Sequence, residues 1–178
     1  MLKKLKYFLI FIFILIISYV LTAMYSFHQL HKGIFYNDKH LIENYVEWES
    51  VRKNVKKFIN TEILDKTNSD EKTKQLGDVG ILLSSFVGKF VEIAIDTYLN
   101  SDGIILLLEK SQKKGEIPRP SIITFLGSFT IMENNGINSF YINYENDGKL
   151  YPIYFLRDGI KWKINKIEFP KKIFNKIK

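Results

Sequence analysis

The sequence predicts an α+β protein: an N-terminal transmembrane helix, then several helices packed on a four-stranded antiparallel β-meander. Three observations lead to this prediction. An uncharged run occupies Tyr7–Phe27, apolar residues then recur at helical spacing, and turn signals separate β-rich segments in the last third of the chain. Helices that precede strands along the chain are typical of an α+β domain, in which the helices cover one face of the sheet.

The run from Tyr7 to Phe27 has the length of a membrane span. At about 1.5 Å per residue its helix is roughly 31 Å long, close to the thickness of a bilayer's hydrocarbon core. Lys3, Lys4 and Lys6 precede the run, so the positive-inside rule places the N-terminus in the cytoplasm and the rest of the chain outside. For a bacterial protein we therefore expect a single-pass protein of the inner membrane, with its domain in the periplasm or outside.

A cleaved signal peptide is the alternative to an anchor. The run is longer than the apolar stretch of a signal peptide, and the best cleavage site, Leu21-Thr22-Ala23, has a bulky residue where a small one is needed. We therefore expect three parts: an anchor or uncleaved signal over 1–27, an extracytoplasmic α+β domain over 28–170, and a basic tail over 171–178. The chain has no cysteine, which excludes disulfides, thiol catalysis and cysteine-based zinc sites.

Helical signals follow the anchor. The segment Asp38–Tyr45 predicts a short helix capped by Asn37 or Asp38. A second helix is predicted from apolar residues at i, i+4, i+7, i+8 and i+12, and 65–74 is predicted as a loop. A third helix is expected over 75–99, and a fourth begins at Ser101, with Ser101 or Asp102 as its cap. The apolar residues of the second helix are Val51, Val55, Phe58, Ile59 and Ile63.

The helix expected over 75–99 has two interpretations. Gly80, Ser84 and Gly88 form a small-residue stripe that lets another helix approach closely. The uncharged stretch 79–88 is too short to cross a membrane, so we favour packing in the core of the domain. Contact with lipid is the alternative.

Strand signals begin after Pro118 and Pro120. Turn sequences separate four β-rich runs over 122–132, 139–145, 150–157 and 160–169, and such short connections indicate an antiparallel meander. Alternation places one set of residues on the same face of the first run: Ile123, Phe125, Phe129 and Ile131. In the last run Trp162 and Ile164 are one residue out of step with Ile167 and Phe169. We therefore predict a β-bulge near Asn165–Lys166, which would restore both pairs to the core face.

No residue pattern points to catalysis. His28 and His31 share a helix face, but no third ligand lies at useful spacing and His40 stands apart, so we expect no metal site. Glu47 and Glu49 flank a helix start without forming a catalytic pair. Because no nucleophile, phosphate or dinucleotide motif is present, an enzyme is the less favoured hypothesis and no cofactor is expected. The net charge of +7 includes three lysines before the anchor, and this mild excess does not indicate nucleic-acid binding.

Two surfaces are candidates for binding. Aromatic residues of the predicted sheet could line an apolar pocket under the helices: Phe125, Phe129, Phe155 and Trp162. The simpler interpretation is that these rings fill the core. The tail carries Lys171, Lys172, Lys176 and Lys178, which would attract it to an anionic membrane surface, and a frayed terminus is the alternative.

Three stretches resemble a known family. They are residues 28–59, 98–108 (YLNSDGIILLL) and 155–170 (FLRDGIKWKINKIEFP), and the last is the most specific. They are similar to small bacterial envelope proteins that have one N-terminal apolar segment and form a domain of unknown function. The resemblance implies an anchor and a helix-then-sheet domain, and it supplies no catalytic or binding residues. A weaker, fold-level similarity is to helix-on-sheet domains of the nuclear-transport-factor type, which often hold small ligands.

The sequence thus predicts a membrane-anchored, non-enzymatic interaction or accessory module. Its expected partners are the membrane and another envelope protein. A domain that binds a lipid or a small apolar ligand in a sheet–helix pocket is the alternative.

Overall fold

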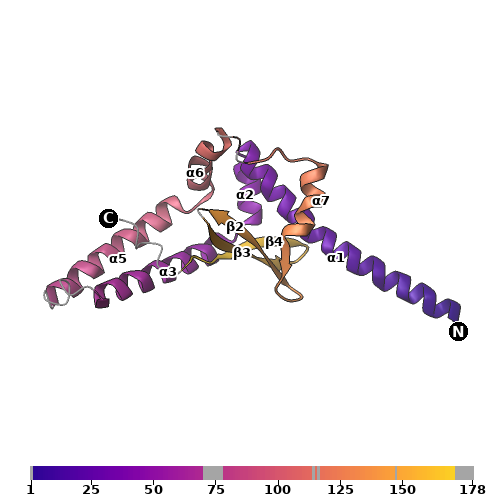
Figure 1. The fold of residues 1–178 in the computed structure, drawn as a ribbon, viewed down its shortest axis with the longest axis horizontal. Helices are drawn as coiled ribbons and strands as arrows, with labels where there is room; N and C mark the ends of the chain where they lie inside the picture. The colour runs from indigo at the N-terminus through magenta and orange to yellow at the C-terminus, as the bar shows by residue number, and fades with distance from the viewer. Residues whose placement is uncertain (1, 70–77, 114, 116, 147, 171–178) are drawn as a thin grey trace.

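The computed structural model describes residues 2–69, 78–113, 115, 117–146 and 148–170. Four strands pair antiparallel in the order β1-β2-β3-β4, which confirms the predicted α+β class and the meander. In Figure 1, α1 extends to one side of the sheet and the paired helices α3 and α5 extend to the other. The elements are α1 (Leu2–Tyr36), α2 (Lys39–Tyr45), α3 (Trp48–Ser69), α5 (Asp78–Tyr98), α6 (Ser101–Lys113), α7 (Ile122–Ile131), β1 (Met132–Asn134), β2 (Ser139–Asn146), β3 (Lys149–Asp158) and β4 (Lys161–Ile167).

The core lies between one face of the sheet and helices α1, α2 and α3. Phe155 of β3 is at its centre, with none of its surface exposed, and its ring stacks on Phe140 of β2 with centroids 4.6 Å apart. Ile42 of α2 and Val51 of α3 belong to the same buried cluster, as does Trp162 of β4. Segments from both ends of the chain therefore meet in a single core.

The β-bulge predicted in the last strand is confirmed. Phe155 pairs with Ile164, but the preceding Tyr154 pairs with Lys166, so Asn165 is the extra residue of β4. Because the bulge shifts the alternation by one residue, Ile164 and Ile167 both pack against the core.

Helix caps follow the sequence in one case and depart from it in another. Asp38 caps α2, as predicted, since its side chain accepts a hydrogen bond of 3.1 Å from the Leu41 N–H. At α6 the cap is Asn100, whose Oδ1 accepts from the Gly103 N–H at 2.9 Å, and neither Ser101 nor Asp102 takes this role. The Ser101 hydroxyl instead donates to Glu43 of α2 at 2.5 Å.

The first predicted strand, over 122–132, is wrong: Ile122–Ile131 is helix α7. A capping box starts the helix, because Ser121 Oγ accepts from the Thr124 N–H and Thr124 Oγ1 accepts from the Ser121 N–H. The β-branched and aromatic residues that suggested a strand express only a weak local preference, which the cap and packing against α1 override. The expected common strand face of this segment therefore does not exist, and β1 is confined to Met132–Asn134.

Helix α3 is longer than predicted. It extends to Ser69, so the part of the expected loop from Asp65 to Ser69 is helical, and residues 70–74 lie outside the described part of the chain. In its described part the predicted apolar stripe faces inward: Val51 is buried, Val55 packs against the core, and Phe58 stacks on Phe169 with ring centroids 4.9 Å apart.

The corner between α5 and α6 depends on Gly103. A Cβ at this position would lie 1.8 Å from the carbonyl oxygen of Tyr98, so the backbone would have to move. We expect Gly103→Ala to destabilise the protein by at least about 1–3 kcal/mol, as overpacking does. A lowered melting temperature of the full-length protein in detergent micelles would measure this loss.

Gly127→Ala on α7 is the matched control for that prediction. An added Cβ there meets nothing within 4 Å, and alanine favours a helix interior over glycine. Equal losses in the two variants would contradict a specific steric role for Gly103.

Candidate functional site

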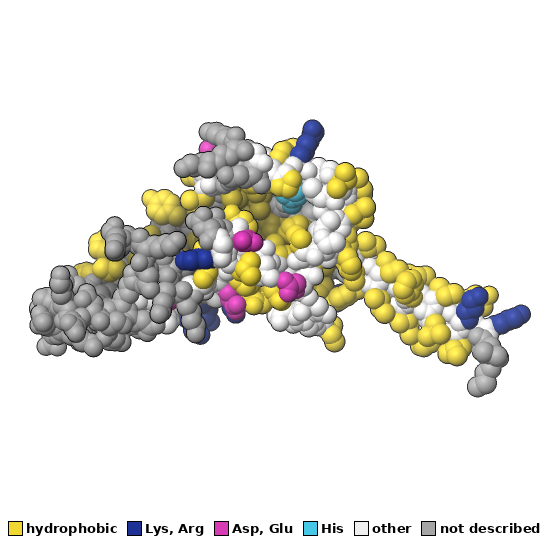
Figure 2. Space-filling model, in the orientation of Figure 1, with side chains coloured by type: hydrophobic (Ala, Val, Ile, Leu, Met, Phe, Trp, Pro, Cys, Tyr) yellow, Lys and Arg dark blue, Asp and Glu magenta, His cyan; other side chains and the backbone are white. Residues whose placement is uncertain are grey.

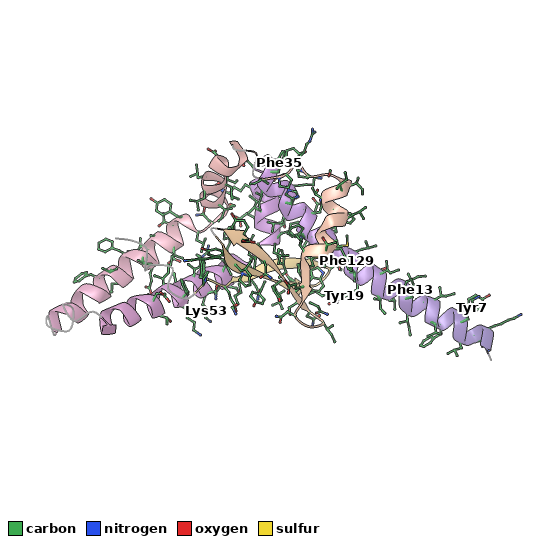
Figure 3. All side chains as sticks on the ribbon, viewed as in Figure 1. Tyr7, Phe13, Tyr19, Phe35, Lys53 and Phe129 are labelled. Carbon is green, nitrogen blue, oxygen red and sulfur yellow. The ribbon has the colours of Figure 1, made fainter. Side chains whose placement is uncertain are left out.

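The first half of α1 is exposed on all sides. Every described side chain from Lys3 to Ser18 is exposed, and from Tyr7 onward nearly all of them are apolar (Tyr7 and Phe13 are labelled in Figure 3). By its length and composition α1 can cross a membrane. This segment is therefore the candidate membrane contact of the chain.

The second half of α1 belongs to the core of the domain. The indole Nε1 of Trp162 donates to Thr22 Oγ1 at 3.0 Å, and the Trp162 backbone N–H donates to Ser26 Oγ at 3.1 Å. Tyr19 packs edge-on against the Trp162 ring, and Ala23 is buried. The helix thus passes from the exposed apolar segment into the core without a break, and the boundary expected between residues 27 and 28 falls inside it.

Two loops of the sheet reach the point where α1 enters the domain. The guanidinium of Arg157 lies 4.9 Å from the centroid of the Tyr19 ring, and the Arg157 N–H donates to the carbonyl of Asn138 at 2.9 Å. The β1–β2 loop and the β3–β4 turn therefore both lie near Tyr19. At their tips Ile137 and Ile160 are 83% and 77% exposed.

Helix α7 runs beside the second half of α1. The ring of Phe125 lies 5.5 Å from the ring of His28, and the carbonyl of Pro118 lies 2.8 Å from His31 Nε2. Helix α7 also carries large apolar side chains that are exposed. By helical spacing Ile122, Ile123, Leu126 and Phe129 lie on one side of the helix, which we call the α7 face, and Ile131 is exposed as well.

Helix α5 presents a second exposed apolar surface. Polar contacts hold its inner side against α3: Lys56 Nζ lies 2.7 Å from Asp96 Oδ2, and Arg52 donates to the carbonyl of Leu99 at 3.2 Å. Among the large apolar side chains described for α5, only Ile95 is buried. The prediction that this helix packs within the core is therefore wrong for its exposed apolar side chains. The opposite side carries Phe86, Val87, Phe90 and Ile93, which we call the α5 face, and Figure 2 shows hydrophobic side chains over this helix.

The small-residue stripe expected on α5 is described only at Gly88. A Cβ added there would lie 3.9 Å from Asn60 Oδ1 of α3, so this glycine faces α3 and not a further helix. The side chains at positions 80 and 84 lie outside the described part.

The four aromatic residues expected to line a pocket lie in different environments. Phe155 and Trp162 are enclosed in the core, where Phe27, Phe140 and Tyr19 surround them. Phe125 is half-buried against α1, and Phe129 is exposed on α7, so neither belongs to the sheet.

The four lysines expected at the membrane surface lie in the tail. Lys171, Lys172, Lys176 and Lys178 all lie outside the described residues.

The histidines are engaged by their neighbours. His28 and His31 contact the α7 region, and His40 lies 3.1 Å from the Asn44 amide on α2. Within the described residues no group of three or more metal-ligating side chains comes together.

The acidic residues on the sheet are arranged as salt-bridge and hydrogen-bond partners. A hydrogen bond from Lys166 holds the pKa of Glu168 below its usual range, and contact with Lys163 does the same for the pKa of Asp158. A hydrogen bond with Glu133 raises the pKa of Tyr141. These shifts favour ionised carboxylates and a neutral phenol at pH 7, whereas acid catalysis by a carboxyl group needs a raised pKa.

Sequence reasoning missed the contact surface inside the apolar run. Tyr19, Thr22 and Ser26 lie at i, i+3 and i+7, so they share one face of α1, and each carries a hydroxyl group in a mostly apolar segment. That spacing was the available signal for a face that binds protein and not lipid.

The comparisons with known proteins concern the N-terminal part of the chain. Residues 12–107, from the exposed half of α1 through most of the described helices, match the family described as protein of unknown function (DUF2939). No curated protein and no solved structure matches the chain. The match covers more than half of the sequence and includes α1 from residue 12 onward, the α3–α5 pair and the start of α6. The chain therefore belongs to this family of proteins of unknown function.

Proposed function

We propose that this chain is a single-pass membrane protein that presents a non-enzymatic binding domain outside the cytoplasm. In this proposal α1 is the anchor, and the α5 face binds another protein of the same membrane or compartment. The observation that carries the proposal is the α5 face, a row of exposed large apolar side chains on helices that extend away from the anchor (Figure 1). Monomeric proteins rarely expose such a row without a partner.

Packing of α1 favours an anchor that is retained. Cleavage after Ala23 would remove Tyr19, Thr22 and Ala23 from the core, and Trp162 would lose its edge-on ring contact and its indole hydrogen bond. A cleavage site in the middle of a core gives the mature domain an incomplete core. The same contacts argue that anchor and domain move as one body.

The shape of the α5 face favours a protein over a small ligand. Its side chains project from one side of a helix, whereas small ligands bind in concave sites. Aromatic side chains such as Phe86 and Phe90 are suited to fill pockets on a partner, and burying each would contribute about 1.5–3 kcal/mol. By contrast, Phe155 and Trp162 are covered by neighbouring rings, which weakens the case for a pocket around them.

Orientation is tested by cysteine labelling, which is clean because the chain has no native cysteine. Ser50→Cys lies on the exposed side of α3, and Lys4→Cys lies before the anchor. In intact cells that make the full-length protein, a membrane-impermeant maleimide should label Ser50→Cys, and Lys4→Cys only after permeabilisation. The reverse pattern would contradict the proposed orientation, and labelling of both would contradict a membrane-spanning α1.

Binding through the α5 face is tested by photo-crosslinking. We expect a benzoyl-phenylalanine at Phe90 to give one discrete protein adduct in native membranes, and Phe86→Asp in the same chain to abolish it. Tyr144 on β2, which is 57% exposed, is the control site and should give no such adduct. Adducts with lipid alone, or equal adducts from both sites, would contradict the proposal. An adduct with a mass near twice the 21.0 kDa of the chain would mean that the partner is a second copy of this chain and not a different protein.

A further inference from the structure

The part of α1 that is exposed on all sides is too short to cross a bilayer. Between Tyr7 and Ser18 the helix is free on all sides, which amounts to about 18 Å at 1.5 Å per residue. A hydrocarbon core is about 30 Å thick, so the next two turns of α1 must also lie within it. On one side those turns already contact the sheet, and α7 contacts the turns that follow them.

The two sides of α1 differ over these next turns. The side that holds Thr22 and Ser26 faces β4, and Arg157 lies over Tyr19 on this side, where a cation suits the headgroup level. The side that carries Leu21 and Tyr25 remains exposed, at 45% and 54%. From Tyr7 to Tyr25 this exposed side is about 28 Å long, which matches the hydrocarbon core.

The α7 face continues this exposed apolar side. Contacts of His28 and His31 with the α7 region place the helix alongside the turns of α1 that directly follow Tyr25. Along α7 the exposed Ile122, Leu126 and Phe129 follow i, i+4, i+7 spacing, so they form one stripe. In Figure 2 hydrophobic side chains extend over this side of the molecule and onward along α1.

Basic residues mark the far end of this surface. Lys32 lies on the same side of α1 as Tyr25, two turns further along, and Arg119 precedes α7 next to Pro118, whose carbonyl contacts His31. An apolar surface that ends in cations matches the order of acyl chains and headgroups in a leaflet.

We propose that the α7 face, together with Leu21 and Tyr25, is embedded in the outer leaflet of the membrane that α1 spans. The inference rests on the proposed function, because it requires α1 to cross the bilayer. Its occupant is the acyl region of that leaflet. A tilt of α1 toward α7 moves the α7 face toward the acyl region and the side of α1 that carries Arg157 toward the headgroups, and tilts of about 20° are common for membrane helices. The exposed Ile137 and Ile160 at the nearby loop tips then also meet the membrane.

The test uses single-cysteine spin labels on the full-length chain in lipid vesicles. Leu126→Cys reports on the α7 face, and Phe13→Cys reports on the anchor. Leu107→Cys is the matched control, because Leu107 is also an exposed leucine on a helix, α6, remote from the exposed half of α1. Collision with oxygen, which concentrates in lipid, and with a water-soluble nickel chelate reports the surroundings of each label.

We expect the labels at Leu126 and Phe13 to be accessible to oxygen and protected from the nickel chelate. The label at Leu107 should be accessible to the nickel chelate. A nickel-accessible label at Leu126 beside a lipid-exposed label at Phe13 would overturn this inference and leave the anchor intact. A label at Leu126 that neither reagent reaches would mean that protein covers α7, and would also overturn it. Nickel access at Phe13 would overturn the proposed anchor itself.

Discussion

A fragment that begins at residue 28 should fail to fold, whereas a fragment that begins at residue 19 should keep the fold. The shorter fragment lacks Tyr19, Thr22, Ala23 and Ser26, so Trp162 would lose its ring contact and two hydrogen bonds. Uncovering a core aromatic costs about 3–5 kcal/mol, as much as truncating it to alanine. The two hydroxyl contacts add about 1 kcal/mol each, and the total stability of a domain is only about 5–15 kcal/mol.

The measurement is near-UV circular dichroism combined with thermal unfolding, both in mild detergent. The longer fragment should show a fixed aromatic signal and a cooperative transition, and the shorter one neither. Cooperative unfolding of both at the same temperature would mean that residues 19–27 contribute nothing to the core.

Phe155→Ala should be one of the most damaging single substitutions in this protein. Phe155 has no exposed surface, it stacks on Phe140, and its ring centroid lies 6.1 Å from that of Phe27 on α1. Such a substitution leaves a cavity between the sheet and α1 and costs about 3–5 kcal/mol. For a chain of this size the melting temperature should fall by about 6–20 °C.

Phe129→Ala on α7 removes the same atoms from a residue that is 60% exposed, so it serves as the control. Its effect on thermal unfolding of the full-length protein in micelles should be small. A loss for Phe129→Ala equal to that for Phe155→Ala would show that burial in the core does not determine the cost.

The sequence was sufficient where a local rule decides the structure. Asp38 is a helix cap by chemistry, and the bulge at Asn165 follows from a strand alternation that slips by one residue. Short turns were sufficient to order β2, β3 and β4 as a meander. Each of these features needs information from only a few neighbouring residues.

Features that depend on distant contacts were not predictable in the same way. The segment after Ser121 has strand-like composition, and its helix is stabilised by a cap and by α1, about 100 residues away by sequence number. For α5 the apolar composition indicated burial, but composition cannot show that a single helix, α3, would cover one side only. The candidate site consists of such uncovered faces, so sequence alone could not locate it.

The hydrogen bond between Thr22 and Trp162 also constrains how the protein is made. Its partners are 140 residues apart, so the core cannot close until nearly the whole chain has been synthesised. At about 5–20 residues per second, ribosomal synthesis leaves this face of α1 without its partner for on the order of ten seconds. In the proposed single-pass protein, the hydroxyl face of the nascent helix lies in the membrane or in the translocation machinery during that interval. Under the proposed function, membrane insertion is therefore coupled to the late arrival of the last strand.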